Sequence, residues 1–459
     1  MPNGASSDTP PNSSRRTQLS FPDMVRALRH RNFQLFFSGQ LISLIGTWMD
    51  NIAEGWLVYR LTHSAFLLGV ATFAGQIPVF LLAPLGGMIA DRFDRRKVVI
   101  GTQASSMLIA GALAGLTLAG KITVREVIVL AACMGSVNAV DIPTRQAFLV
   151  QMVGRDDLMN AIALNSSMFN AARVVGPSIA GLLVAWKGEG WCFAVNSVSY
   201  IAVISGLVAM RIKPIVREVQ VVSPLAHIAE GFRFARNTAP IRTILLLIAL
   251  VSLFATPYAV LMPIFAANVL HGNAKTLGVL MGATGVGAVI GALVLAARSG
   301  VRGLGRWVAI ACGGFGTFLI LFAFSRWYFV SVALLVPVGF CVMVQMASSN
   351  TLIQSMVPDR LRGRVMSIYS MMFMGMAPIG ALLAGWLAGR ITAPWTVAIG
   401  GTGAIVGAIV FGRNLPKIRV EARQLIMAQG LAGPPAQPLN SATLSSNADT
   451  LNVETESRH

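Results

Sequence analysis

The chain has 459 residues, of which 55% are hydrophobic and only 12% are charged, and its mean hydropathy is +0.68. Soluble domains carry about 25% charged residues, so this composition excludes an ordinary soluble enzyme or binding domain. Apolar runs of about 20 residues, long enough to cross a bilayer as helices, recur along most of the chain. The net charge of +18 comes mainly from basic residues in alternate loops and tails. This distribution indicates that the basic residues set the orientation of the protein in the membrane, and it argues against nucleic-acid binding.

The first half of the chain predicts six membrane spans. Residues 1–20 are polar, lack the apolar core of a signal peptide and are predicted to be a disordered tail. Residues 21–30 predict a short interfacial helix. The spans follow in an N-terminal bundle, residues 21–211, near 34–59, 64–90, 98–119, 126–149, 159–186 and 191–211.

A longer polar segment, residues 212–242, separates this bundle from a second one and is interpreted as a cytoplasmic linker. Ser223 and Pro224 suit the start of a helix. The apolar Leu225, Ile228 and Phe232 then recur at helical spacing, which predicts an amphipathic helix at the membrane surface. The C-terminal bundle, residues 243–412, has predicted spans near 243–266, 276–297, 306–325, 327–350, 364–389 and 394–412. Residues 413–459 are predicted to be a disordered cytoplasmic tail.

The two halves show an internal repeat. Asp156-Asp157-Leu158 corresponds to Asp359-Arg360-Leu361, and Pro177 corresponds to Pro378. Two halves of the same orientation are typical of transporters that bind substrate between them. Twelve spans put both termini on one side, and the basic loops place that side in the cytoplasm.

Charged residues are concentrated between the second and third spans, at Asp91–Lys97, and mark a membrane surface. Together with the preceding glycine they resemble the loop signature of the major facilitator superfamily, carried here by Gly87, Asp91, Arg92, Arg96 and Lys97. Asp94 departs from the glycine usual at its position. The corresponding loop of the second half, residues 298–306, is basic but has no acid.

Two further motifs refine this resemblance. Gly176, Pro177 and Gly181 in span five resemble the motif of proton-driven exporters. Residues 141–146 and 165–173 are similar to the enterobactin-exporter-like branch of transmembrane secretion effectors. The resemblance implies a fold of twelve helices in two six-helix bundles, and secondary transport of a siderophore or a hydrophobic drug.

A conformational latch is expected around the signature loop. Asp141 and Arg145 are four residues apart in span four and can form an ion pair. That pair has either a structural role or a functional one, in which it exchanges partners with Asp91 and Arg95. Asp91 is also expected to face the start of span eleven, near Arg364.

Charged residues inside spans are functional candidates, because each is costly to insert. Asp50 and Glu54 share one face of the first span and are proposed proton-coupling residues. A solvated position for Glu54 near the outer surface is the alternative. Arg173, with Asn165 and Asn170 on the same helix, is expected to attract an anionic substrate group or to lower the pKa of a nearby acid. A structural role as a donor to backbone carbonyls is the alternative. Candidate cavity aromatics are Trp48, Phe73, Tyr258 and Phe373.

These features predict a multi-pass protein of the bacterial inner membrane, acting as a monomeric proton-coupled exporter. Its expected partners are a small-molecule substrate, protons and the lipid bilayer. No cofactor or metal is expected, because the four cysteines have no metal-site spacing and no phosphate-binding loop is present. A uniporter or importer indifferent to pH remains an alternative. A non-transporting sensor or scaffold is a third hypothesis, and no catalytic constellation supports an enzyme.

Overall fold

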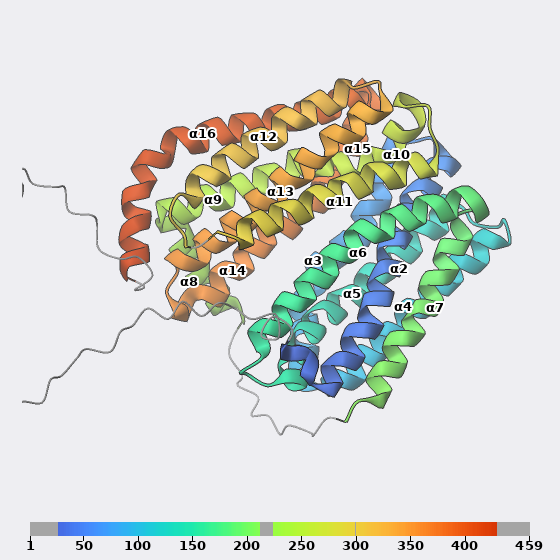
Figure 1. The fold of residues 1–459 in the computed structure, drawn as a ribbon, viewed down its shortest axis with the longest axis horizontal. Coiled ribbons are helices and arrows are strands. Elements are labelled where there is room, and N and C mark those ends of the chain that lie inside the picture. Colours follow the sequence, from blue (N-terminus) through green and yellow to red (C-terminus); the bar gives the residue numbers. More distant parts are fainter. Residues whose placement is uncertain (1–25, 212–223, 299, 429–459) are drawn as a thin grey trace, which may run out of the picture.

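The structure is a computed structural model and describes residues 26–211, 224–298 and 300–428 (Figure 1). Within these residues the secondary structure is helical, without strands. Eleven helical segments are long and apolar enough to cross a membrane. A further helix, α2 (Arg31–Thr62), has 32 residues, but the polar Gln40, Asp50 and Glu54 lower its hydropathy. The predicted all-α polytopic fold is confirmed.

Six long helices form the first bundle, where the sequence predicts six spans. They follow the short 3-10 helix η1 (Arg26–Arg29) and are α2, α3 (Ala65–Arg92), α4 (Arg95–Leu118), α5 (Val124–Val153), α6 (Leu158–Lys187) and α7 (Glu189–Ala209). Side-chain caps define several of the starts. Ser64 accepts the Leu67 N–H at the start of α3, and Thr123 with Glu126 forms a capping box on α5.

The second bundle also contains six spans, two of which are interrupted. Span seven consists of α9 (Ala239–Leu250), η2 (Val251–Ala255), η3 (Thr256–Leu261), α10 (Met262–Ile264) and η4 (Phe265–Val269). Span eleven consists of α14 (Asp359–Met374) and α15 (Met376–Ile391). The other spans are α11 (Ala274–Ala296), α12 (Leu304–Phe324), α13 (Tyr328–Met356) and α16 (Ala393–Ala428).

The segments between and beyond the bundles are described in part. The linker helix α8 (Pro224–Asn237) begins at the predicted proline. Helix α16 continues past residue 412, where the last span is expected to end. The expected N-terminal tail, residues 21–25 of the interfacial helix, residues 212–223 and residues 429–459 lie outside the described residues.

The interruptions in spans seven and eleven lie side by side. Pro257 and Pro263 lack the N–H that a regular helix needs, and π-helical and 3-10 turns surround them. The Ser252 hydroxyl of η2 donates to the carbonyl oxygen of Phe373, at the end of α14, over 2.5 Å. Irregular backbone at membrane depth occurs where it is buried in protein or lines a cavity. Neither interruption was predicted from the sequence.

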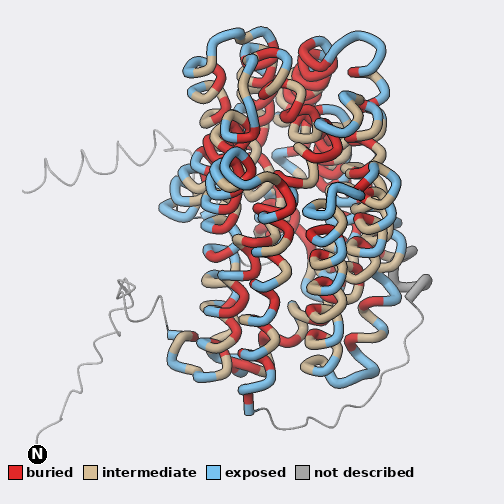
Figure 2. The backbone as a smooth tube through the Cα atoms, turned by 90° about the vertical axis from the view of Figure 1, so that its right-hand side faces the viewer, coloured by how far each residue is buried: buried red, intermediate tan, exposed pale blue. Residues whose placement is uncertain are grey.

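The two ends of the molecule differ in charge and in packing. The basic end carries η1, the Asp91–Lys97 loop, α8 and the start of α14. At the opposite end, named here the closed end, α2 turns into α3 and α15 turns into α16. The two bundles meet near α10 and diverge towards α8 (Figure 1). Buried residues lie mainly on helix faces that are turned toward other helices (Figure 2).

Candidate functional site

One seam between the bundles joins α6 to α11 at the closed end. A Cβ atom added to Gly278 would lie 2.5 Å from the Pro177 carbonyl oxygen and 2.8 Å from the Gly181 Cα. Only small residues allow two helix backbones to approach this closely. Next to this seam, the Tyr59 hydroxyl of α2 donates to Asn268 Oδ1 over 2.5 Å, which also connects the bundles. Two residues of the exporter-type motif, Pro177 and Gly181, therefore lie at the interface between the halves.

A second seam joins α3 to α15. A Cβ atom on Gly69 would lie 2.6 Å from the Ala381 carbonyl oxygen, and one on Gly385 would lie 2.6 Å from that of Ala65. Farther along α3, the ring of Phe80 contacts Gly375, where span eleven is interrupted. Both seams therefore run from the closed end to about the middle of the membrane.

Toward the basic end the same helix faces separate. The α6–α11 seam ends where Gly285 lies against Arg173 and Val174, and beyond it Ser167 of α6 is exposed. On α3, Gly87 lies five helical turns from Gly69 on the same face. A Cβ atom on Gly87 would have no neighbour within 4 Å. The two halves are thus closed at one end and open at the basic end.

Arg173 lies midway along α6, where the first seam ends. The Tyr258 side chain of η3, from the other half, is close enough to interact with it electrostatically, and Tyr258 is itself in hydrogen-bonding reach of Thr284. No carboxylate among the described residues forms an ion pair with Arg173. The structure therefore brings two of the predicted residues together across the halves, and Arg173 has no ion-pair partner there among the described residues.

Aromatic side chains extend this region within the first half. The Trp48 ring packs edge-on against Phe169, with centroids 5.5 Å apart, and Gly176 lies directly against the Trp48 Cβ. Phe73 and Phe373 are partly buried, and neither ring pairs with another described aromatic ring.

The two predicted asparagines of α6 differ in their bonding. The Asn170 amide donates to the Ser166 carbonyl oxygen over 2.9 Å. Its hydrogen bond is therefore made within its own helix. Asn165 lies farther along α6 toward the basic end and is partly buried.

The acidic residues of α2 lie mainly inside the first bundle. Asp50 is 8% exposed, and its Oδ1 atom has no hydrogen-bond partner among the described residues. Asn196 of α7 and Glu54 are its neighbours. Glu54 is partly buried one turn farther along. Asp50 is therefore directed at α7 and not at the seam with the second half, which the sequence alone did not reveal.

The signature loop ties several helices together at the basic end. Arg95 is 11% exposed and donates to the Ala147 carbonyl of α5 over 2.6 Å. Arg96 donates to the carbonyls of Leu207 and Val208 at the end of α7, where a cation also complements the helix dipole. Arg92 lies over the neighbouring Phe93 ring, 5.9 Å from its centroid.

Asp94, which departs from the usual signature, begins helix α4. Its carboxylate accepts the backbone N–H of Arg96 over 2.9 Å and that of Lys97 over 3.4 Å. This is the bonding of an N-cap, a position where Asp is favoured. The substitution thus preserves the turn by stabilising the helix that follows it.

The predicted latch residues form two separate pairs in this conformation. Asp91 is 74% exposed and pairs with Arg95 over 3.3 Å. Asp141 is buried, accepts hydrogen bonds from Thr102 and Gln103, and lies 3.5 Å from Arg145. Arg364 pairs with Glu230, so it is not paired with Asp91 in this conformation.

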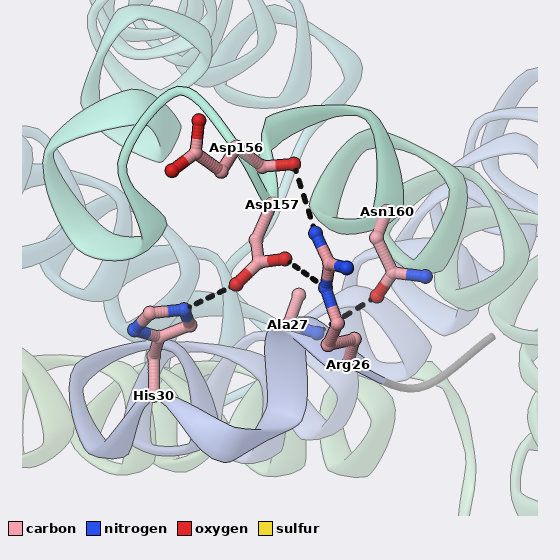
Figure 3. Close-up of polar contacts among 6 residues, drawn as sticks. All are labelled: Arg26, Ala27, His30, Asp156, Asp157 and Asn160. Carbon is pink, nitrogen blue, oxygen red and sulfur yellow. Dashed lines mark hydrogen bonds and ion pairs between the residues drawn. The ribbon is translucent and has the colours of Figure 1, made fainter. Parts of the chain in front are cut away.

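The segment before the first bundle is docked on the start of α6 (Figure 3). The Asp157 carboxylate accepts from Arg26 and from His30, the latter over 2.7 Å. The Ala27 N–H donates to Asn160 Oδ1 over 2.8 Å. The hydrogen bonds from His30 and then Arg26 hold the pKa of Asp157 below its ordinary value.

The linker helix α8 is docked in the same way on the start of α14, with the charges reversed. Here the acid is on the preceding helix: Glu230 accepts from Arg360 over 2.7 Å and also from Arg364. Gly231 packs against the Arg364 side chain. Neither dock was predicted from the sequence, although the internal repeat pairs Asp157 with Arg360.

Comparison with known proteins places this geometry in context. The sequence matches the family described as transmembrane secretion effectors over residues 24–442. It is 27% identical to a staphyloferrin A transporter of Staphylococcus aureus, over 82% of this chain and 94% of that relative. It is 25% identical to an enterobactin exporter of Citrobacter koseri, over 85% of this chain and 93% of that relative.

Solved transporters have the same fold. The nucleoside transporter NupG superposes with a TM-score of 0.63 at 12% identity, covering 85% of this chain and 98% of that chain. A bacterial homologue of the iron transporter ferroportin, in an inward-facing state, gives a TM-score of 0.62 at 18% identity, covering 83% of this chain and 98% of that chain. At these identities the likeness extends to the fold alone.

Proposed function

The chain belongs to the transmembrane secretion effectors, transporters of the major facilitator type, and from this we propose that it is a proton-coupled exporter of a small organic molecule. It acts in the bacterial inner membrane with both termini in the cytoplasm. The orientation rests on the basic residues, because positive charge in short loops favours the cytoplasmic side. In that orientation the conformation is inward-facing.

Alternating access is the mechanism that the geometry supports best. The observation that carries it is the ending of both seams midway through the membrane, at Gly285 and at Gly375. Glycine contacts hold the closed end together, whereas Gly87 on the same face of α3 is uncovered. A rocking motion that closes the basic end and opens the other would expose the central region to the outside.

The substrate is proposed to bind at this central region and to carry an anionic group. Arg173 provides an unpaired positive charge, and Tyr258 provides a hydroxyl from the opposite half. Trp48 and Phe169 offer an adjacent aromatic surface. The similar staphyloferrin A transporter and enterobactin exporter make a siderophore the first substrate class to test, ahead of a hydrophobic drug.

Proton coupling is proposed to use Asp50, with Glu54 as its neighbour on α2. Asp50 is buried without an ion-pair partner among the described residues, and intramembrane acids of this kind are functional candidates by default. Protonation from outside removes its charge and favours return to the inward-facing state. Release of the proton inside restores the charge and favours the loaded, outward-directed step.

The test is transport by the purified protein in proteoliposomes, with staphyloferrin A and enterobactin as the first probes. An imposed pH gradient should drive transport of at least one probe, and Asp50→Asn should abolish the response to the gradient. Glu126→Gln is the matched control, because glutamine also serves in a capping box and the helix start is retained. Gradient-driven transport at full rate in Asp50→Asn would refute the coupling assignment.

A pH-independent uniporter or importer is the second candidate. The direction of Asp50 toward α7, away from the seam between the halves, favours it. In that case both Asp50→Asn and an uncoupler would leave the transport rate unchanged.

A further inference from the structure

A second polar cluster lies inside the first bundle, between α2 and α7. Its centre is Asn196 of α7, which is 0% exposed and whose Nδ2 atom has no hydrogen-bond partner among the described residues. Asp50 Oδ1 is likewise buried without a partner. A buried amide donor and a buried carboxylate acceptor are thus left unsatisfied beside each other, although either alone is costly to bury.

The other contacts of Asn196 lie on the oxygen side of its amide. The Ser199 hydroxyl donates to the Asn196 backbone carbonyl over 2.7 Å and also lies 3.3 Å from Oδ1. Nδ2 has no partner among the described residues, and Asp50 is a neighbour with which Asn196 interacts. On α2, one turn before Asp50, a Cβ atom added to Gly46 would lie 2.6 Å from Asn196 Oδ1. The absence of a side chain at Gly46 therefore provides the space that Asn196 occupies.

The other groups that face Asp50 cannot replace this donor as a charged partner. Glu54 on α2 is an acid, and Cys192 and Tyr200 on α7 are uncharged when protonated. Tyr200 itself is in reach of Thr47 and Asn196. No described Lys, Arg or His forms an ion pair with Asp50.

We propose that Asn196 is a positioning residue for Asp50, donating a hydrogen bond from Nδ2 to the ionised carboxylate and losing most of that bond when Asp50 is protonated. This inference rests on the proposed proton coupling by Asp50. Hydrogen bonds to an ionised acceptor are roughly twice as strong as neutral ones. The contact between α2 and α7 would therefore be tighter in the ionised state than in the protonated state.

The rest of α2 connects this contact to the interface between the halves. Tyr59 lies nine residues beyond Asp50 on the same helix, or about 14 Å at 1.5 Å per residue, and its hydroxyl donates to Asn268 of the second half. Arg60 beside it pairs with Glu189 at the start of α7 over 2.7 Å. A change in how α2 packs on α7 would thus reach a hydrogen bond that holds the closed end together.

The test compares two variants that differ only in a hydrogen-bond donor. The test uses Asn196→Thr and Asn196→Val, because threonine and valine side chains have nearly the same shape. Only the threonine hydroxyl retains a hydrogen-bond donor toward Asp50. Gradient-driven transport is measured as a function of internal pH in proteoliposomes. The pH of half-maximal transport should rise by about 1 unit in Asn196→Val relative to Asn196→Thr, a tenfold change in proton concentration.

Both variants are then repeated in the Asp50→Asn background, where any proton-independent transport and the thermal stability are compared. The difference between valine and threonine should disappear there, because no carboxylate remains to receive the bond. Coincident pH profiles of the two variants, with Asp50→Asn still abolishing coupling, would overturn the role of Asn196 alone. Undiminished coupling in Asp50→Asn would instead overturn the proposed proton coupling by Asp50, on which this inference rests.

Discussion

At the scale of single residues, Asp157 connects the entry of the chain to span five. Its carboxylate accepts hydrogen bonds from His30 and Arg26, and these hold its pKa below the ordinary value. Because the pKa is lower in the folded state than in the unfolded state, the contact contributes stability above the ordinary carboxyl pKa. That contribution is lost as the pH falls through the lower, folded value.

The first prediction follows from this pH dependence. A nitroxide label on Arg29→Cys, with the exposed Cys133 replaced by Ala, should be immobile from about pH 5 to 8. It should become mobile only as the pH falls below the ordinary carboxyl pKa of about 4, because the folded pKa of Asp157 is lower still. In Asp157→Asn the label should be mobile across the whole range. Asp156→Asn is the control, since the hydrogen bond from Arg26 to Asp156 is to its backbone carbonyl, which the substitution retains. An immobile label in Asp157→Asn would contradict the docking role of this carboxylate.

Asn196 and Asp94 show how local signals at single residues are missed. Asn196 is a polar residue in an apolar span, which is itself a signal because such residues are costly in hydrocarbon. Its partner on α2 is far away in the sequence, so pattern alone could not supply it. Asp94 immediately precedes a helix, so its role as a cap could be predicted from residues close to it in the sequence.

At the scale of helices, η1 and α8 each bind one span at the basic end of the molecule. The other end of that span packs against the opposite half and forms a seam. Helix η1 binds the start of α6, which packs on α11 at the closed end. Helix α8 binds the start of α14, whose continuation α15 packs on α3. Span eleven is interrupted at Gly375, whereas α6 is continuous. The second dock therefore lies on a part of span eleven that the interruption at Gly375 separates from the seam.

A prediction for this dock is that α8 and α14 separate when Glu230 loses its charge. Glu230→Gln should broaden the distance distribution between spin labels on α8 and α14. Glu230→Arg combined with both Arg360→Glu and Arg364→Glu should narrow it again, because Glu230 pairs with both arginines. The loss of stability should be about 1 kcal/mol or less, because the pair is partly exposed. Asp359→Asn, which breaks a local pair with Arg362 on α14, is the matched control.

An unchanged label distance in Glu230→Gln would show that packing, such as that of Gly231 on Arg364, holds α8 without the ion pairs. A distance that broadens equally in Asp359→Asn would indicate a general loosening of α14.

At the scale of the whole molecule, neighbouring glycines of α3 have different expected roles. Gly86 packs against the Ala139 backbone of α5, inside the first bundle. Gly87 has no neighbour within 4 Å of an added Cβ, and it lies on the same face of α3 as Gly69, which packs on α15. The proposed closure of the basic end would cover Gly87.

The resulting prediction contrasts the two positions. Gly87→Leu should leave expression and thermal stability close to wild type but reduce transport at least tenfold, because the added side chain obstructs closure of the basic end. Gly86→Leu should instead prevent folding, since overpacking against a helix backbone destabilises the bundle. Transport assays and size-exclusion profiles distinguish the two results. Full transport by Gly87→Leu would refute the proposed closure of this face.

The class of protein, the membrane spans and the motifs could all be predicted from the sequence. Apolar runs fix spanning helices because backbone groups in hydrocarbon must bond within their own segment. Charge clusters mark the membrane surfaces for a similar reason, since Asp91–Lys97 could not lie in lipid. Such properties depend on residues that are close together along the chain.

The contacts between residues far apart in the sequence are known only from the tertiary structure. It paired Arg173 with Tyr258 across the halves, directed Asp50 toward Asn196 and joined Glu230 to Arg364. It also set where each seam ends and where spans seven and eleven break. These features depend on how the faces of distant helices pack, and the spacing within one apolar helix does not specify which neighbour each face contacts.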